Sequence, residues 1–75
     1  MEQDVKAIVA EVLEIPVGQI NEQTTMESVD TWDSLRHMEM IVAIERRFNV
    51  EFEAEEALEM TSIEGIKRML GAKLK

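Results

Sequence analysis

Apolar residues recur at the spacing of an α-helix in three separate segments of this 75-residue chain, and no segment alternates convincingly as a β-strand would. The three stripes lie within residues 1–14, 34–48 and 61–75, and a shorter run of helix formers spans 54–59. The pattern predicts an all-α fold, a small four-helix bundle with three longer helices and one short third helix. At this length we expect a single domain over residues 1–75.

A long loop is expected between the first two helices. Pro16 disfavours helical backbone at the residue before it, so the first helix should end by about Glu14. From there to Trp32 the apolar residues are isolated, which predicts a loop tied down by its own side chains. Within it, Thr24-x-x-Glu27 fits the capping box of a short helical turn. We expect Trp32 to pack over this loop.

Capping residues mark where the later helices begin. Asp33 is placed to cap a second helix over residues 34–48. Thr61-x-x-Glu64 fits a capping box ahead of the last helix. The apolar side chains expected on the buried face of that helix are Ile63, Ile66, Met69, Leu70 and Leu74.

Composition argues against several classes of function. The net charge of −8, with no basic run longer than two residues, argues against nucleic-acid binding. The longest apolar stretch, residues 40–44, is far shorter than a membrane span, and the N-terminus lacks a signal-peptide pattern. We therefore expect a cytoplasmic monomer without membrane insertion. With no cysteine and a single histidine, the chain offers no disulfide, no thiol nucleophile and no ordinary metal site.

The second predicted helix has two apolar stripes on largely opposite sides. One contains Met40 and Ile44, with His37 at its border, and is an ordinary core stripe. The other either packs beneath the loop or the short helix, or forms an exposed docking face for another protein, and we favour the docking face. The residues of that face are Leu35, Met38, Glu39, Val42, Glu45 and Arg46.

Ser34 stands at the head of this helix, within the triplet Asp33-Ser34-Leu35. A hydroxyl at the first helical position lies beside free backbone N–H groups and the positive end of the helix dipole, which together stabilise a phosphate ester. Judged by this local feature alone, most such serines are simply part of a helix cap.

The whole chain resembles the acyl carrier protein family. The resemblance rests on Val12-Leu13-Glu14-Ile15-Pro16-Val17, the long loop, Trp32-Asp33-Ser34-Leu35, and residues 38–48 followed by a short helix. It implies that a phosphopantetheinyl transferase attaches 4'-phosphopantetheine from coenzyme A to Ser34 and reads Asp33 and Leu35. The thiol of the arm would carry acyl groups as thioesters, so the protein would be a carrier and not an enzyme.

The resemblance also implies a site for the cargo and a set of partners. In that family an apolar pocket shelters the acyl group, and the matching residues here are Met40, Ile44, Phe52, Ala57 and Met60. The partners would be acyl-loading and acyl-processing enzymes of fatty-acid-like, polyketide or other specialised biosynthesis.

The second helix departs from the family pattern in its charge. Acidic or small residues are common in the family just after Ser-Leu and late in this helix, whereas this chain has Arg36, His37, Arg46 and Arg47. Residues 34–48 thus hold three arginines against two glutamates. A partner with a basic patch is expected to bind this helix more weakly, which favours a specialised carrier over the general fatty-acid carrier.

Two alternatives stay open. A discrete aminoacyl or peptidyl carrier would use the same arm on Ser34. An unmodified helical adaptor would keep the fold for protein binding alone, and would tolerate Ser34→Ala but not Val42→Glu. A small enzyme is disfavoured, because Ser34 and His37 lack a positioned acid and the strained turn of a hydrolase nucleophile.

Overall fold

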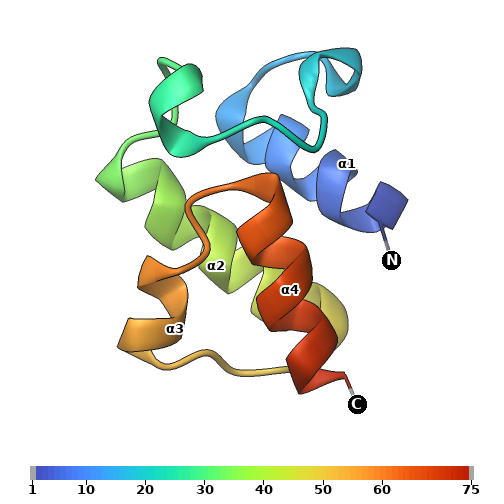
Figure 1. Ribbon diagram of the computed structural model, residues 1–75, viewed down its shortest axis with the longest axis vertical. Coiled ribbons are helices and arrows are strands. Elements are labelled where there is room, and N and C mark those ends of the chain that lie inside the picture. Colours follow the sequence, from blue (N-terminus) through green and yellow to red (C-terminus); the bar gives the residue numbers. More distant parts are fainter. Residues whose placement is uncertain (1, 75) are drawn as a thin grey trace.

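The structure, a computed structural model, describes residues 2–74 and is all-helical over that range (Figure 1). The four α-helices are α1 (Glu2–Leu13), α2 (Ser34–Phe48), α3 (Ala54–Leu58) and α4 (Ile63–Lys73). Two short 3₁₀ turns, η1 (Val17–Gln19) and η2 (Met26–Ser28), interrupt the long loop between α1 and α2. The predicted fold of three longer helices and one short third helix is confirmed, and α2 has its predicted bounds.

The helix α1 packs against both α2 and α4. In Figure 1 the long loop crosses the top of the view, and α3 lies at the lower left, between the end of α2 and the start of α4. The described chain measures 29 × 23 × 19 Å along its principal axes. The three longer helices therefore enclose the interior, and α3 is a small separate piece at its edge.

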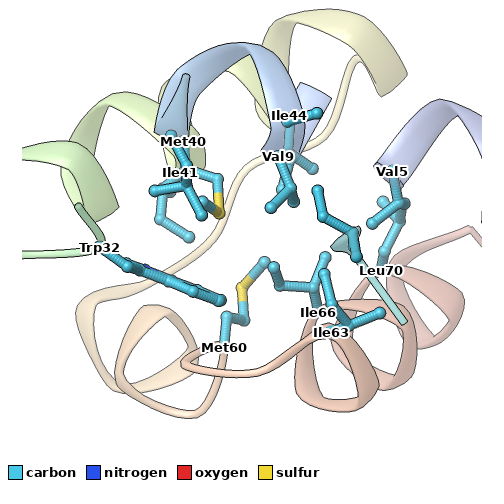
Figure 2. Packing of buried hydrophobic residues seen from close by; sticks show 13 residues of the cluster. Val5, Val9, Trp32, Met40, Ile41, Ile44, Met60, Ile63, Ile66 and Leu70 are labelled. Carbon is cyan, nitrogen blue, oxygen red and sulfur yellow. The ribbon is translucent and has the colours of Figure 1, made fainter. Parts of the chain in front are cut away.

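The predicted stripes supply the core. Val5, Val9 and Leu13 recur every four residues along α1 and are fully buried. The loop contributes Ile20 and Trp32, so Trp32 is part of the core as well as of the loop. Figure 2 shows side chains from α1, α2 and α4 pointing into one interior. The remaining buried apolar side chains are Ala10, Met40, Ile41, Ile44, Met60, Ile63, Ile66 and Leu70.

The end of α1 is a Schellman turn built on a glutamate. The amide of Ile15 donates to the carbonyl of Ala10 at 3.1 Å, and the amide of Glu14 donates to Glu11 at 3.3 Å. Glu14 takes the left-handed backbone, with φ at 59°, where glycine is usual. The helix ends one residue before Glu14, as the position of Pro16 predicts.

Both predicted capping boxes are wrong by one residue. The turn η2 is capped by Thr25, whose hydroxyl accepts from the amide of Ser28, and not by Thr24. The helix α4 is capped by Ser62, whose hydroxyl accepts from the amide of Gly65 at 2.9 Å, and not by Thr61.

A short backbone pairing explains both shifts. Thr25 and Ser62 form an isolated antiparallel bridge, in which the amide of Met26 donates to Thr61 and that of Ile63 donates to Thr24. These bonds are 2.8 and 3.0 Å long. They hold the loop against the start of α4 and fix which residue of each pair can act as the cap.

The last helix also differs from its predicted apolar face at its end. Leu74 lies just beyond α4 as its C-terminal cap and is 47% exposed, so it is not a core residue. The face is buried at Ile63, Ile66 and Leu70. Leu74 follows the last turn of α4, where the described residues leave nearly half of its surface exposed.

Candidate functional site

Ser34 is the first residue of α2, and its side chain is exposed. Asp33 caps the helix: its carboxylate accepts from the amide of Arg36 at 2.9 Å. The amides of Ser34 and Leu35 belong to the first turn and have no acceptor within the helix. The hydroxyl of Ser34 therefore stands at the positive end of a 15-residue helix, with room around it for a substituent.

The two other serines are used in caps. The hydroxyl of Ser28 donates to the carbonyl of Thr25 and accepts from its amide, and that of Ser62 accepts from Gly65. Among the hydrogen bonds of residues 2–74, none involves the hydroxyl of Ser34. Ser34 is thus the serine whose side chain is not engaged in holding the fold.

Arg36 fastens this end of α2 to α1. Its guanidinium donates to the carbonyl of Val12 at 2.6 Å and to the carboxylate of Glu14 at 2.8 Å. The hydrogen bond that Arg36 donates to Glu14, together with the charge of that carboxylate, raises the pKa of the Arg36 guanidinium. Thr31 adds a second tie, because its hydroxyl donates to the carbonyl of Leu13 at 2.8 Å. The position of Ser34 relative to α1 is set by these contacts.

The second apolar stripe of α2 is exposed. Leu35 is 69% exposed, Met38 63% and Val42 40%, so neither the loop nor α3 covers them. Met38 and Val42 also line a groove that continues onto α1, where Glu11 and Val12 form the opposite side. An exposed apolar row with acidic residues beside it has the composition of a surface that meets another protein.

The arginines of α2 are less available than a count of charges indicates. Arg36 is paired with Glu14, and Arg47 is paired with Asp4 of α1 at 3.2 Å. Among residues 2–74, neither Arg46 nor Glu39 of α2 forms an ion pair. Glu45 is occupied as well, since its carboxylate accepts from the amide of Phe52 at 2.8 Å.

The residues expected to line an acyl pocket divide into two groups. Met40, Ile44 and Met60 have no exposed surface and belong to the core. Phe52 and Ala57 are half-buried and pack against that core from the side of α3. Figure 2 shows the side chains of Met40 and Met60 directed into the same interior, beside the ring of Trp32. A bound molecule could contact Met40, Ile44 and Met60 only if neighbouring elements moved apart.

One feature that the sequence did not predict is the bonding of His37. The ring borders the core as expected and is 8% exposed. Its Nδ1 accepts from the indole Nε1–H of Trp32 at 3.0 Å, and its Nε2 lies 2.8 Å from the carbonyl oxygen of Ala57 in α3. The five-residue spacing of Trp32 and His37 was a local signal for the first bond, but nothing local indicated the second.

Two kinds of site are missing from the described part of the chain. Residues 2–74 contain no group of three or more histidine, cysteine, aspartate or glutamate side chains placed to hold a metal ion. Over the same range, no helix has both the length and the apolar character needed to cross a bilayer.

Comparison with known proteins identifies a matching family model and a similar carrier protein. The family model described as a phosphopantetheine attachment site matches residues 3–70. The protein named polyketide-8 synthase acyl carrier protein 1, from Streptomyces avermitilis, is 33% identical over 64 residues, which are 85% of this chain and 76% of that protein. The residues matched by the family model include α2 and α3 entirely, α1 except its first residue, and α4 except its last three residues.

Proposed function

Because this chain belongs to the acyl carrier protein family and contains a phosphopantetheine attachment domain, we propose that Ser34 is the residue to which 4'-phosphopantetheine is attached. Members of this family are carriers and not catalysts. The observation that supports the assignment is the exposed hydroxyl of Ser34 at the first position of α2. Asp33 and Leu35 flank it and would be read by the phosphopantetheinyl transferase.

The residues at this place suit a phosphate ester. The substituent would leave the helix at its N-terminus, where unpaired amides and the helix dipole stabilise negative charge. Asp33 is engaged with the amide of Arg36, so its carboxylate is directed into the first turn of the helix. Esterification of Ser28 would remove the proton that its hydroxyl donates to Thr25, and the hydroxyl of Ser62 already caps α4 by accepting from Gly65. The bound arm supplies a thiol, which the cysteine-free chain does not.

The cargo is proposed to be an acyl group of polyketide or similar specialised biosynthesis. The relative from Streptomyces avermitilis, a polyketide synthase acyl carrier protein by name, supports this choice. The acyl group would be sheltered on the side where α2 faces α3, against Phe52 and Ala57 and then Met40, Ile44 and Met60. An aminoacyl or peptidyl group on the same arm is the second candidate, and fatty-acid-like cargo the third.

Partner enzymes are proposed to dock on the exposed stripe of α2. Leu35, Met38 and Val42 supply the apolar contact, and their exposure supports this role. Glu39, Glu45 and Arg46 border the stripe. The phosphopantetheinyl transferase, the acyl-loading enzymes and the acyl-processing enzymes would each dock on this same face in turn.

The remaining properties follow from this assignment. We place the protein in the cytoplasm, where coenzyme A and the enzymes that use it are found. Residues 1–75 would act as one carrier domain and as a monomer, since a carrier must present the same face to several enzymes in turn. The acidic net charge of −8 argues against nucleic acid as a partner.

The test is enzymatic modification followed by intact mass spectrometry. Incubation with coenzyme A, Mg²⁺ and a broad-specificity transferase should add one phosphopantetheine to the wild-type chain and none to Ser34→Ala. Ser62→Thr, which keeps a capping hydroxyl, is the matched control and should be modified like wild type. A wild-type chain that stays unmodified with several transferases, or a Ser34→Ala chain that is still modified, contradicts the proposal.

A further inference from the structure

A single buried side chain joins the attachment end of α2 to α3. His37 lies three residues after Ser34, and its ring reaches across to the carbonyl oxygen of Ala57, 2.8 Å from Nε2. On its other side, Nδ1 accepts from the indole of Trp32, which is 3% exposed. No other hydrogen bond among residues 2–74 links α2 directly to a residue of α3.

The partners of the ring determine where its proton lies. An indole Nε1–H can only donate, so Nδ1 of His37 must be the acceptor. The neutral ring then carries its proton on Nε2 and donates it to Ala57. Trp32 thus holds His37 in the one tautomer that can bind α3. The bond to Trp32 is buried and the bond to Ala57 is partly buried, so breaking either one costs more than at the surface.

The helix α3 depends on such contacts for its position. Five residues are too few for a helix that is stable by itself. Apart from the bond to His37, α3 is held at the surface by the ion pair between Glu56 and Lys73, 2.9 Å apart. It is also held by its half-buried residue Ala57 and by the bond that fixes Phe52 just before it.

We propose that His37 is a latch, a positioning residue whose bond to Ala57 determines how readily α3 separates from α2. The part of the inference that concerns cargo rests on the proposed function. Met40, Ile44 and Met60 have no exposed surface, so an acyl chain starting at Ser34 reaches them only when α2 and α3 part. Opening breaks the bond between His37 and Ala57, and α3, too short to be stable by itself, then loses the contacts that protect its amides and that of Met60.

Amide hydrogen exchange in the unmodified protein tests the latch without any cargo. His37→Phe keeps a buried ring but removes both bonds, and His37→Gln keeps an N–H that can donate to Ala57. We expect the amides of Ala57 and Met60 to exchange about tenfold faster in His37→Phe, and at nearly the wild-type rate in His37→Gln. The amide of Ile66 in α4 is the internal control and should be unchanged in both variants.

Several results would overturn the latch. If the ring served only as core filling, His37→Phe would be tolerated better than His37→Gln, which is the opposite order. Equal acceleration of Ala57, Met60 and Ile66 in His37→Phe would indicate general destabilisation. Nitrogen NMR of the wild-type ring needs no variant: the proposal requires a proton on Nε2 and none on Nδ1, and a ring protonated on Nδ1 contradicts it even if His37→Phe fails to fold.

A second experiment separates the latch from the proposed function. An octanoyl group is loaded on the arm, and the methyl signals of Met40 and Met60 are compared before and after loading in wild type and in His37→Phe. We expect both signals to move on loading, and to move further in His37→Phe. Failure to load the arm contradicts the proposed function and leaves the exchange result standing. Loading that leaves both methyl signals in place contradicts the role of the latch in admitting cargo.

Discussion

Arg36 and Glu14 form an ion pair of 2.8 Å that joins the head of α2 to the C-terminal end of α1. Glu14 reaches this position from a left-handed backbone conformation. The guanidinium of Arg36 also caps the C-terminal end of α1, because it donates to the carbonyl of Val12 at 2.6 Å. The arginine that follows the Asp-Ser-Leu triplet is therefore a structural tie. It contributes less to the positive charge of the exposed face than its place in the sequence indicates.

Replacing this arginine should loosen the attachment end of α2. Arg36→Met removes the ion pair and leaves the carbonyl of Val12 without its donor, so we expect a lower Tm and faster amide exchange around Ser34. The matched control is Arg46→Met on the same helix, where no ion pair is lost among the described residues, and its Tm should stay close to wild type. Equal Tm values for the two variants would contradict the tie.

Local patterns predicted much of this fold, and contacts between distant segments account for the errors. The extent of α2 follows from its own periodicity and from Asp33, both of which are local. The choice between Thr24 and Thr25, or between Thr61 and Ser62, is made by backbone pairing of the loop with the start of α4. No property of either segment alone carries that information.

The candidate site shows the same division. Ser34 and the exposed stripe of α2 were predictable because helical geometry places them. The bonds from Arg36 to Glu14, just after α1, and from His37 to Ala57 in α3 were not, because these partners lie 22 and 20 residues away in sequence. A charge count treats Arg36 as free, and a helical projection treats His37 as a border residue of the core.

The two glycines of α4 should respond in opposite directions to alanine. A Cβ on Gly65 would clash with the carbonyl oxygen of Glu59, so the end of α3 packs too closely for any side chain. We expect Gly65→Ala to destabilise the fold by about 1–3 kcal/mol. Gly71 has no neighbour within 4 Å of the same position, and Gly71→Ala should stabilise the helix by about 0.5–1 kcal/mol. Urea unfolding of both variants checks the sign, and a stabilised Gly65→Ala would contradict the packing.

Acid should weaken the interactions of the Glu56 carboxylate with the amide of Glu53 and with Lys73. The amide of Glu53 and the ammonium group of Lys73 hold the pKa of the Glu56 carboxyl below its usual value. A carboxyl with a lowered pKa in the folded state stabilises the protein above its unfolded pKa, and this contribution is lost as the pH falls through the folded pKa. Glu56→Gln should therefore lower the Tm at neutral pH, and the difference from wild type should close below about pH 4.

Glu55→Gln is the control for that titration, because Glu55 is an exposed neighbour on α3 without a partner among the described hydrogen bonds and ion pairs. It should leave the Tm nearly unchanged from neutral pH to about pH 4. The explanation fails if Glu56→Gln and Glu55→Gln have the same pH profile.

A charge placed in the exposed stripe should block docking without harming the fold. Val42 is 40% exposed, so we expect Val42→Glu to change stability by no more than about 0.5 kcal/mol. Its kcat/KM with a phosphopantetheinyl transferase should fall by about tenfold or more, as for a central interface residue. Val17→Glu introduces the same charge at an exposed position of the loop and should be modified at the wild-type rate. Equal rates for the two variants would argue against docking on α2.

A carrier of the proposed kind holds its cargo on Ser34. Intact mass spectrometry of the protein purified from its native host, followed by fragmentation of the modified species, tests it most directly. We expect a phosphopantetheine arm on Ser34, with an acyl group on its thiol in part of the population. An arm located on any other residue, or a protein that is wholly unmodified in its own host, would contradict it.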